Sequence, residues 1–221
     1  MRQLPKLYLL LISLLFLVIV SCRISKFKNY SNDRRGISKA LITPVLSSQQ
    51  PSKFKATIDV LKNHLTGILI VKQTDSVATH FVFVTELGMK MFDFVYKGNR
   101  MEAAYVFEPL NKPKLIRSLM RNFENMFLLN SANKSINYFK SKTNFLFFKL
   151  EGVPKTNTCS YLRSDSTSHF TSQEIFHHRK KSSLINYIYN ANSQSYSQIK
   201  CIQYGLVKIH IELNEIPKTN D

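Results

Sequence analysis

The side chains that could carry chemistry are few and mostly isolated. The acidic residues are sparse and lie singly, so no two carboxylates are placed as a general acid and base. His177 and His178 are the only histidine pair, and the positive charges of Arg179, Lys180 and Lys181 that follow oppose a metal ion there. Phosphate-binding loops and the common hydrolase and zinc-protease patterns are absent. We therefore expect no enzyme activity, metal or cofactor, and interpret the histidine pair as part of a solvated loop.

Cys22 is the residue whose sequence context predicts a chemical role most clearly. Arg2 and Lys6 form a positive start, Leu7–Val20 is almost wholly apolar, and a small residue, Ser21, precedes the cysteine. This order is typical of a secretory signal peptide. The apolar run is shorter than the ~20 residues that a spanning helix needs. The alternative interpretation is an uncleaved anchor helix with an incidental cysteine.

The tetrapeptide Ile-Val-Ser-Cys22 resembles the lipobox of bacterial lipoproteins, whose cysteine thiol is acylated after cleavage before it. Two or three acyl chains would hold the protein stably on a membrane that it does not span. The resemblance implies a signal peptide over residues 1–21, a lipidated cysteine with a flexible basic tether over 22–52, and a domain over 53–216. Within the tether, Ile37–Leu46 is more apolar and suits a short helix. Arg23 follows the cysteine, which favours the outer membrane, facing the periplasm, because no aspartate marks inner-membrane retention.

The net charge of +17 is strongly positive. Such a charge attracts either anionic lipid headgroups or nucleic acid. The basic residues are scattered, no nucleic-acid recognition pattern is present, and an exported protein seldom meets nucleic acid. We therefore expect membrane lipids rather than nucleic acid as partners, with most of the charge on a solvated surface.

Cys159 and Cys201 are the other cysteines. An exported compartment permits a disulfide between them, but spacing alone does not show that they are close. They are either bonded or independent small core residues. Neither belongs to a Cys-x-x-Cys pair, so no zinc or redox site is indicated.

Short segments of alternating apolar and polar residues follow from Phe54 onward, which predicts β-strands. The links between them are short, as at Lys97-Gly98-Asn99, and short links favour an antiparallel sheet. Ser164–Ser183 is polar and basic and predicts a long loop, with at most one short strand or turn around Ile175-Phe176. The predicted strands are Phe54–Val60, Ile68–Val71, His80–Thr85, Met89–Tyr96, Met101–Phe107, Ile136–Phe139, Asn144–Leu150, Cys159–Arg163, Leu184–Tyr189, Gln198–Tyr204 and Val207–Leu213.

One amphipathic helix is predicted over Lys112–Leu129, with Asn111 as N-cap and Pro113 in its first turn. Its apolar stripe must cover something, and the obvious partner is one face of the preceding sheet. The stripe comprises Leu115, Ile116, Leu119, Met120, Phe123, Met126 and Phe127.

Phenylalanine is abundant, with sixteen residues, whereas tryptophan is absent. One interpretation is an ordinary core between sheet and helix. The other is an apolar cavity, lined by one face of the sheet, that accepts acyl chains. The candidate lining residues are Phe81, Phe83, Phe92, Phe94, Phe145, Phe147, Leu119 and Phe123.

Four segments resemble the LolA/LolB family of lipoprotein carriers and receptors. They are Phe54–Leu61, Gly67-Ile-Leu-Ile70, Phe83–Phe92 and the closing Tyr204–Leu213. The resemblance implies a mainly β (α+β) fold, an incomplete antiparallel barrel of about eleven strands closed by helices. It also implies an outer-membrane receptor that accepts acylated lipoproteins from a periplasmic carrier and delivers them to the membrane.

In the receptor, an apolar residue protrudes from the loop that ends in Leu-Gly and is needed for membrane delivery. That role falls here on Leu87, beside Gly88; the alternative for Leu87 is a buried strand end. This chain departs from the family in having no tryptophan, and in carrying Thr85-Glu86 where Asn-Pro is usual. A non-transfer envelope lipoprotein of the same fold, acting as a lipid-binding or assembly adaptor, is therefore a second hypothesis.

Overall fold

The structure is a computed structural model that describes residues 51–60, 62–75, 78–129, 135–140, 146–151, 158–178 and 180–217. The expected signal peptide, Cys22, the tether with its helix at Ile37–Leu46, and Phe145 lie outside the described residues. Phe147 lies on a strand of which only the backbone is described. No helix among the described residues is long and apolar enough to cross a membrane.

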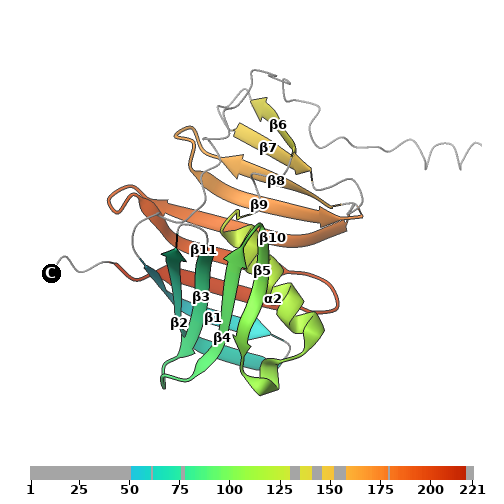
Figure 1. The fold of residues 1–221 in the computed structure, drawn as a ribbon. Helices are drawn as coiled ribbons and strands as arrows, with labels where there is room; N and C mark the ends of the chain where they lie inside the picture. The colour runs from blue at the N-terminus through green and yellow to red at the C-terminus, as the bar shows by residue number, and fades with distance from the viewer. Residues whose placement is uncertain are drawn as a thin grey trace, which may run out of the picture. The chain divides into compact units, whose positions relative to one another are not determined.

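Twelve strands form one sheet in the order β5-β4-β3-β2-β1-β12-β11-β10-β9-β8-β7-β6 (Figure 1). Every neighbouring pair is antiparallel. The sheet is open, since β5 and β6 stand at the two ends of this order. The strands are β1 (Ser52–Val60), β2 (Asn63–Asp75), β3 (Ala78–Thr85), β4 (Lys90–Lys97), β5 (Arg100–Val106), β6 (Ser135–Lys140), β7 (Leu146–Glu151), β8 (Thr158–Ser164), β9 (Phe170–His177), β10 (Lys180–Asn190), β11 (Ser195–Gln203) and β12 (Ile209–Glu215).

The predicted fold class is confirmed: an open, mainly antiparallel β architecture with a helix against the sheet. The twelfth strand is β9, in the segment predicted as a long loop. The possible short strand around Ile175-Phe176 is correct in position, but β9 is eight residues long, so the prediction of a long loop was wrong. β9 looks polar because its buried face includes Gln173, whose side-chain oxygen accepts a hydrogen bond from the Tyr187 hydroxyl at 3.2 Å. On the other face, Glu174 pairs with Lys181 at 2.7 Å. Because one side chain of β9 is a hydrogen-bonded buried amide and another belongs to a cross-strand ion pair, the sequence of this strand has the polar composition of a surface loop.

The predicted helix is α2 (Pro113–Met126), preceded by the short 3-10 helix η2 (Glu108–Leu110). Its N-cap is Lys112, in extended conformation and without a side-chain cap, so the prediction of Asn111 was wrong. Asn111 instead ends η2, where its backbone N–H donates to the Glu108 carbonyl at 2.9 Å. Pro113 explains why the helix begins without a cap, because its fixed φ suits the first helical position.

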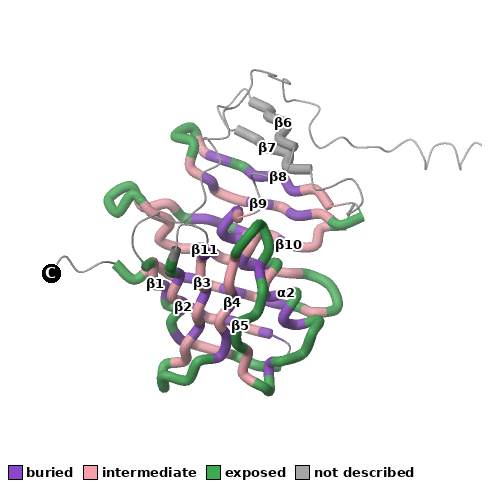
Figure 2. Tube along the Cα trace, in the orientation of Figure 1, coloured by how far each residue is buried: buried purple, intermediate pink, exposed green. Residues whose placement is uncertain are grey.

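The buried residues of the strands share one face, which we call the inner face. Buried positions alternate with less buried ones along β1 and β12, and along β3 from Phe81 onward, as the two-residue period of a strand requires. Figure 2 shows buried and less buried stretches following one another along the labelled strands. The stripe of α2 predicted from sequence is buried against this face, with Met120 only partly buried. The core is therefore a layer between one helix and the inner face of the sheet.

Gly67 on β2 marks a close approach between strands. A Cβ added there would lie 2.0 Å from the Val84 carbonyl oxygen, and a backbone atom cannot rotate away. We expect Gly67→Ala to lower the free energy of unfolding by about 1–3 kcal/mol, as overpacking does. Urea denaturation measures this, with the half-buried neighbour Thr66→Ala as control. Equal stability of the two variants would contradict the close approach.

Candidate functional site

The predicted cavity residues on β3, β4 and α2 meet in one place, which we call the inner phenylalanine cluster: Phe81, Phe83, Phe92, Phe94, Leu119 and Phe123. Phe123 lies at its centre. Its ring centroid is 6.0 Å from that of Phe81, 5.7 Å from Phe92 and 6.2 Å from Phe94. Phe92 stacks on Phe94 at 4.4 Å and lies 5.3 Å from Phe83. These tilted and stacked arrangements are the ones that aromatic rings favour.

All six members of the cluster are at most 1% exposed. Phe81 and Phe83 on β3, and Phe92 and Phe94 on β4, are each two residues apart and share one face, and Leu119 and Phe123 are four residues apart on one side of α2. In this conformation the side chains fill the space between helix and sheet with one another. An acyl chain could enter the cluster only if α2 moved away from the sheet.

The C-terminal end of α2 is held to the sheet by aromatic and polar contacts. Phe127, just after the helix, contacts Phe54 at 5.9 Å and Phe81 at 5.2 Å. The Tyr96 hydroxyl donates to the Leu129 carbonyl at 2.9 Å. These contacts fix the end of the helix over β1, β3 and β4.

Two further hydrogen bonds reach α2 from β5 and β10. The Met101 N–H on β5 donates to Glu124 Oε1 at 3.1 Å. The buried Tyr187 hydroxyl on β10 lies 3.2 Å from both the Met126 carbonyl and the Gln173 side-chain oxygen, which share its single proton. Burial raises the pKa of Tyr187 well above its usual value, so this hydroxyl stays protonated and remains a donor.

The inner face becomes more polar from β8 to β10. This region buries four polar side chains, whereas the phenylalanine cluster has none: Ser160, Ser164, Gln173 and Ser183. Ser160 Oγ, Ser164 Oγ and the Asn122 side-chain nitrogen of α2 have no hydrogen-bond partner in the described part of the chain. Sequence reasoning missed these groups, because isolated serines and asparagines in strands and helices are read as surface residues.

Leu87 lies at the tip of the β3–β4 hairpin and is 93% exposed. It is therefore not a buried strand end. The loop is tight: Gly88 N–H donates to the Thr85 carbonyl at 2.9 Å, and Gly88 has φ +82°, which favours glycine. Thr85 Oγ1 also accepts from the Met89 N–H at 3.2 Å. A rigid turn thus presents an unpacked leucine to solvent.

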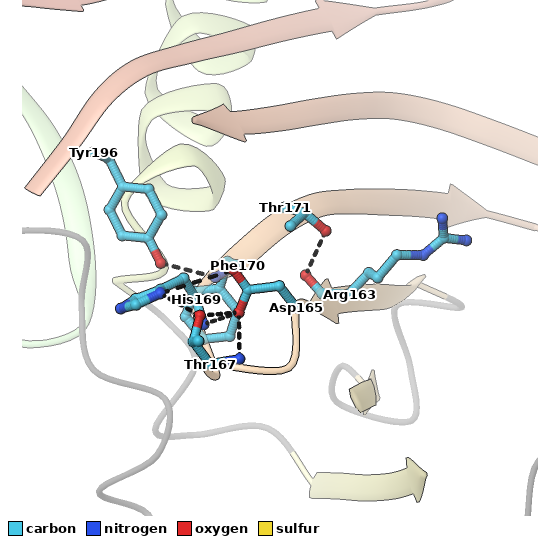
Figure 3. A network of polar contacts seen from close by, with 7 residues as sticks. All are labelled: Arg163, Asp165, Thr167, His169, Phe170, Thr171 and Tyr196. Atoms are coloured by element: carbon cyan, nitrogen blue, oxygen red, sulfur yellow. Dashed lines mark hydrogen bonds and ion pairs between the residues drawn. The ribbon is translucent and has the colours of Figure 1, made fainter. Parts of the chain in front are cut away.

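The β8–β9 hairpin holds a network of polar contacts (Figure 3). Asp165 Oδ1 accepts from the Thr167 N–H at 2.9 Å, the Thr167 hydroxyl at 2.7 Å and the His169 N–H at 2.9 Å. Burial alone would raise the pKa of Asp165, but these hydrogen bonds outweigh it and lower the pKa. The Phe170 N–H donates to the Tyr196 hydroxyl at 2.9 Å, which ties the hairpin to β11. The Asp165 contacts close the turn and the Tyr196 contact anchors it to β11, so the network has a structural role.

Cys159 and Cys201 are both free thiols. Cys201 belongs to the buried inner face, and burial raises its pKa to about 12. Cys159 is adjacent to the inward-facing Ser160 and therefore points to the other face, and β9 and β10 separate the two strands. Opposite faces and two intervening strands exclude a disulfide in this fold. In the described ranges, no group of three His, Cys, Asp or Glu side chains could hold a metal ion.

Comparison with known proteins gives likenesses to solved structures only. No family model matches the sequence. No curated protein matches it either. The chain is similar to the crystal structure of a LolA superfamily protein from Nitrosomonas europaea, with 9% identity over 80% of this chain and 89% of that one, and a TM-score of 0.49.

Phe123 packs against three rings of the sheet, so its loss should be costly. We expect Phe123→Ala to lower the free energy of unfolding by about 3–5 kcal/mol, as large-to-small changes in a core do. The exposed helix residue Arg121→Ala should change it by less than about 0.5 kcal/mol. Chemical denaturation measures both, and a small effect of Phe123→Ala would mean that the helix is loosely packed on the sheet.

Proposed function

We propose that this protein is a lipid-anchored receptor or carrier of the outer membrane, which accepts acylated lipoproteins in its apolar interior and delivers them to the membrane. The observation that carries the proposal is the inner phenylalanine cluster, covered by helix α2. The resemblance of Phe54–Leu61, Phe83–Phe92 and Tyr204–Leu213 to lipoprotein carriers and receptors supports it.

The proposed action is exchange of one apolar environment for another. Burial of an acyl chain contributes about 0.8 kcal/mol per methylene group, so a long chain of about fourteen methylenes contributes roughly 11 kcal/mol, which can offset the displacement of several core side chains. The stripe of α2 covers the inner face while no cargo is bound, and the cargo's acyl chains take its place when the helix moves. No covalent step is required, which agrees with the expectation that the protein is not an enzyme.

The contacts that restrain α2 are compatible with such movement. Apart from ring packing, the helix end is held by hydrogen bonds from Tyr96, Met101 and Tyr187. Each is worth only about 1 kcal/mol net. An acyl chain that enters beneath the helix can therefore offset the loss of all three.

Delivery to the membrane is assigned to the β3–β4 hairpin. A leucine held in the open by a tight turn can bury its side chain in the acyl region of a bilayer without any rearrangement of the protein. Leu87 and Gly88 are the proposed delivery residues. Cys22 would carry the anchor, and a periplasmic lipoprotein carrier would hand over the cargo.

A second candidate function is a non-transfer envelope lipoprotein that acts as an adaptor. The complete burial of the inner phenylalanine cluster favours it, because a core that never opens holds no guest. The two functions differ in whether acyl chains ever occupy the inner face.

Cargo binding is tested on protein purified from residue 23 onward, which lacks the covalent anchor. We expect fatty acyl chains to co-purify, and a fluorescent fatty acid to bind and be displaced by unlabelled fatty acid. Mass spectrometry of an organic extract and fluorescence titration measure the two. If neither acyl chains nor probe binding is found, the adaptor function replaces the carrier function.

The delivery role is tested by Leu87→Glu, since a carboxylate resists entry into a bilayer by about 2.5–3.5 kcal/mol, equivalent to a loss of about a hundredfold. We expect lipoprotein transfer to vesicles to fall by that order while acyl-chain binding is unchanged. The matched control is Asn192→Glu in the β10–β11 turn, which should transfer normally. Full transfer by Leu87→Glu would remove the role of Leu87.

A further inference from the structure

A second leucine is as exposed as Leu87. Leu206, in the loop between β11 and β12, is fully exposed at 102%, and the neighbouring Tyr204 is 43% exposed. The predicted strands end at Tyr204 and resume at Val207, whereas β11 ends at Gln203 and β12 begins at Ile209, so the loop is longer than predicted. Gly205 has φ +115°, which turns the chain outward.

The base of this loop is held firmly. The Tyr204 N–H donates to the Ser182 carbonyl on β10 at 2.8 Å, and the Gln203 side-chain amide donates to the Val207 carbonyl at 2.8 Å. Leu206 is therefore presented by an ordered turn, as Leu87 is. A large apolar side chain in this position gains nothing from the fold and is available to a partner.

The two leucines lie at the same edge of the sheet. β3 and β11 are separated by β2, β1 and β12, and each step between neighbours is antiparallel. Four such reversals make β3 and β11 run in the same direction, so the loops that follow them leave from one edge. With about 4.8 Å between strands, four steps place the two loops roughly 19 Å apart along the sheet.

The described turns at the opposite edge have a different composition. Their tips are Gly98-Asn99, Ser166–Ser168 and Ala191–Gln194, and none has an apolar side chain larger than alanine. The leucine-bearing edge also has Met89, 45% exposed, beside Leu87. Apolar loop tips are thus confined to one edge among the described turns.

The leucine edge is also basic. An exposed lysine stands in or beside each of its four described hairpin loops, whereas two exposed glutamates accompany them. Lysine beside an exposed apolar residue suits an anionic bilayer, where the leucine enters the acyl region and the ammonium group stays among the headgroups. The lysines are Lys62, Lys90, Lys180 and Lys208, and the glutamates are Glu86 and Glu108.

We infer that this edge is a lipid-binding surface that docks on an anionic bilayer through two loops at once, with Leu206 as the second point of insertion beside Leu87. The inference rests on the proposed function, since it names the membrane contact that delivery requires. One inserted loop leaves the domain free to pivot about it. Two loops separated along the edge fix the sheet relative to the membrane, so that bound cargo leaves the domain at a constant position above the bilayer.

The absence of tryptophan from the chain gives a direct test. Full-length protein is reconstituted by its own anchor into phosphatidylglycerol vesicles that contain brominated lipid, which quenches tryptophan on contact. Three single-tryptophan variants are compared: Leu87→Trp, Leu206→Trp, and the control Ser193→Trp at the opposite edge. Because these side chains lie in turns, each variant should keep the stability of the parent protein in denaturation.

We expect strong quenching and a blue-shifted emission at positions 87 and 206, and several times weaker quenching at position 193. Replacing phosphatidylglycerol by phosphatidylcholine should reduce quenching at both leucine positions. Quenching at position 206 no greater than at position 193 would overturn the inference. Such a result would leave the carrier function standing if acyl chains still bind, whereas quenching at 206 without acyl-chain binding would leave only the docking surface.

Discussion

An open sheet of twelve strands has a large apolar face that the strands alone cannot cover. In this protein the problem is concentrated over β1 to β5, where phenylalanines project from adjacent strands. A single amphipathic helix solves it by placing Phe123 among Phe81, Phe92 and Phe94. The position of α2, and therefore whether the inner face is covered, depends on this one layer of aromatic contacts. A ligand that binds to this face must therefore displace the helix.

The inner face has two chemical halves. The phenylalanine cluster is wholly apolar, whereas the region from β8 to β10 buries serines and Gln173. Tyr187 links the halves, because its hydroxyl contacts both Gln173 and the end of α2. An amphiphilic guest would find apolar side chains at one end of this face and polar groups at the other, as its own chain and headgroup require.

Much of this architecture could be predicted from sequence, because two-residue alternation and the stripe of α2 are local signals. The exceptions have physical reasons. β9 was hidden by Gln173, whose partner Tyr187 is fourteen residues away in sequence and is not visible from β9 alone. Leu206 was predicted to lie in a short link between two strands; the observed loop is longer, because β11 ends at Gln203 and β12 begins at Ile209, and it leaves Leu206 exposed. Which phenylalanines touch one another depends on strand order, which local patterns do not show. For example, β1 pairs with β12, so strands from the two ends of the domain are neighbours in the sheet.

Carrier function requires that the inner face can exchange α2 for an acyl chain, and a fatty acid with a photoreactive diazirine tests this on the unmodified protein. After irradiation, peptide mass spectrometry locates the labelled residues. We expect labelling of Phe92, Phe94 and Phe123, blocked by excess unlabelled fatty acid. Labelling confined to outward-facing residues such as Ile68 and Val82, or no specific labelling at all, would contradict it.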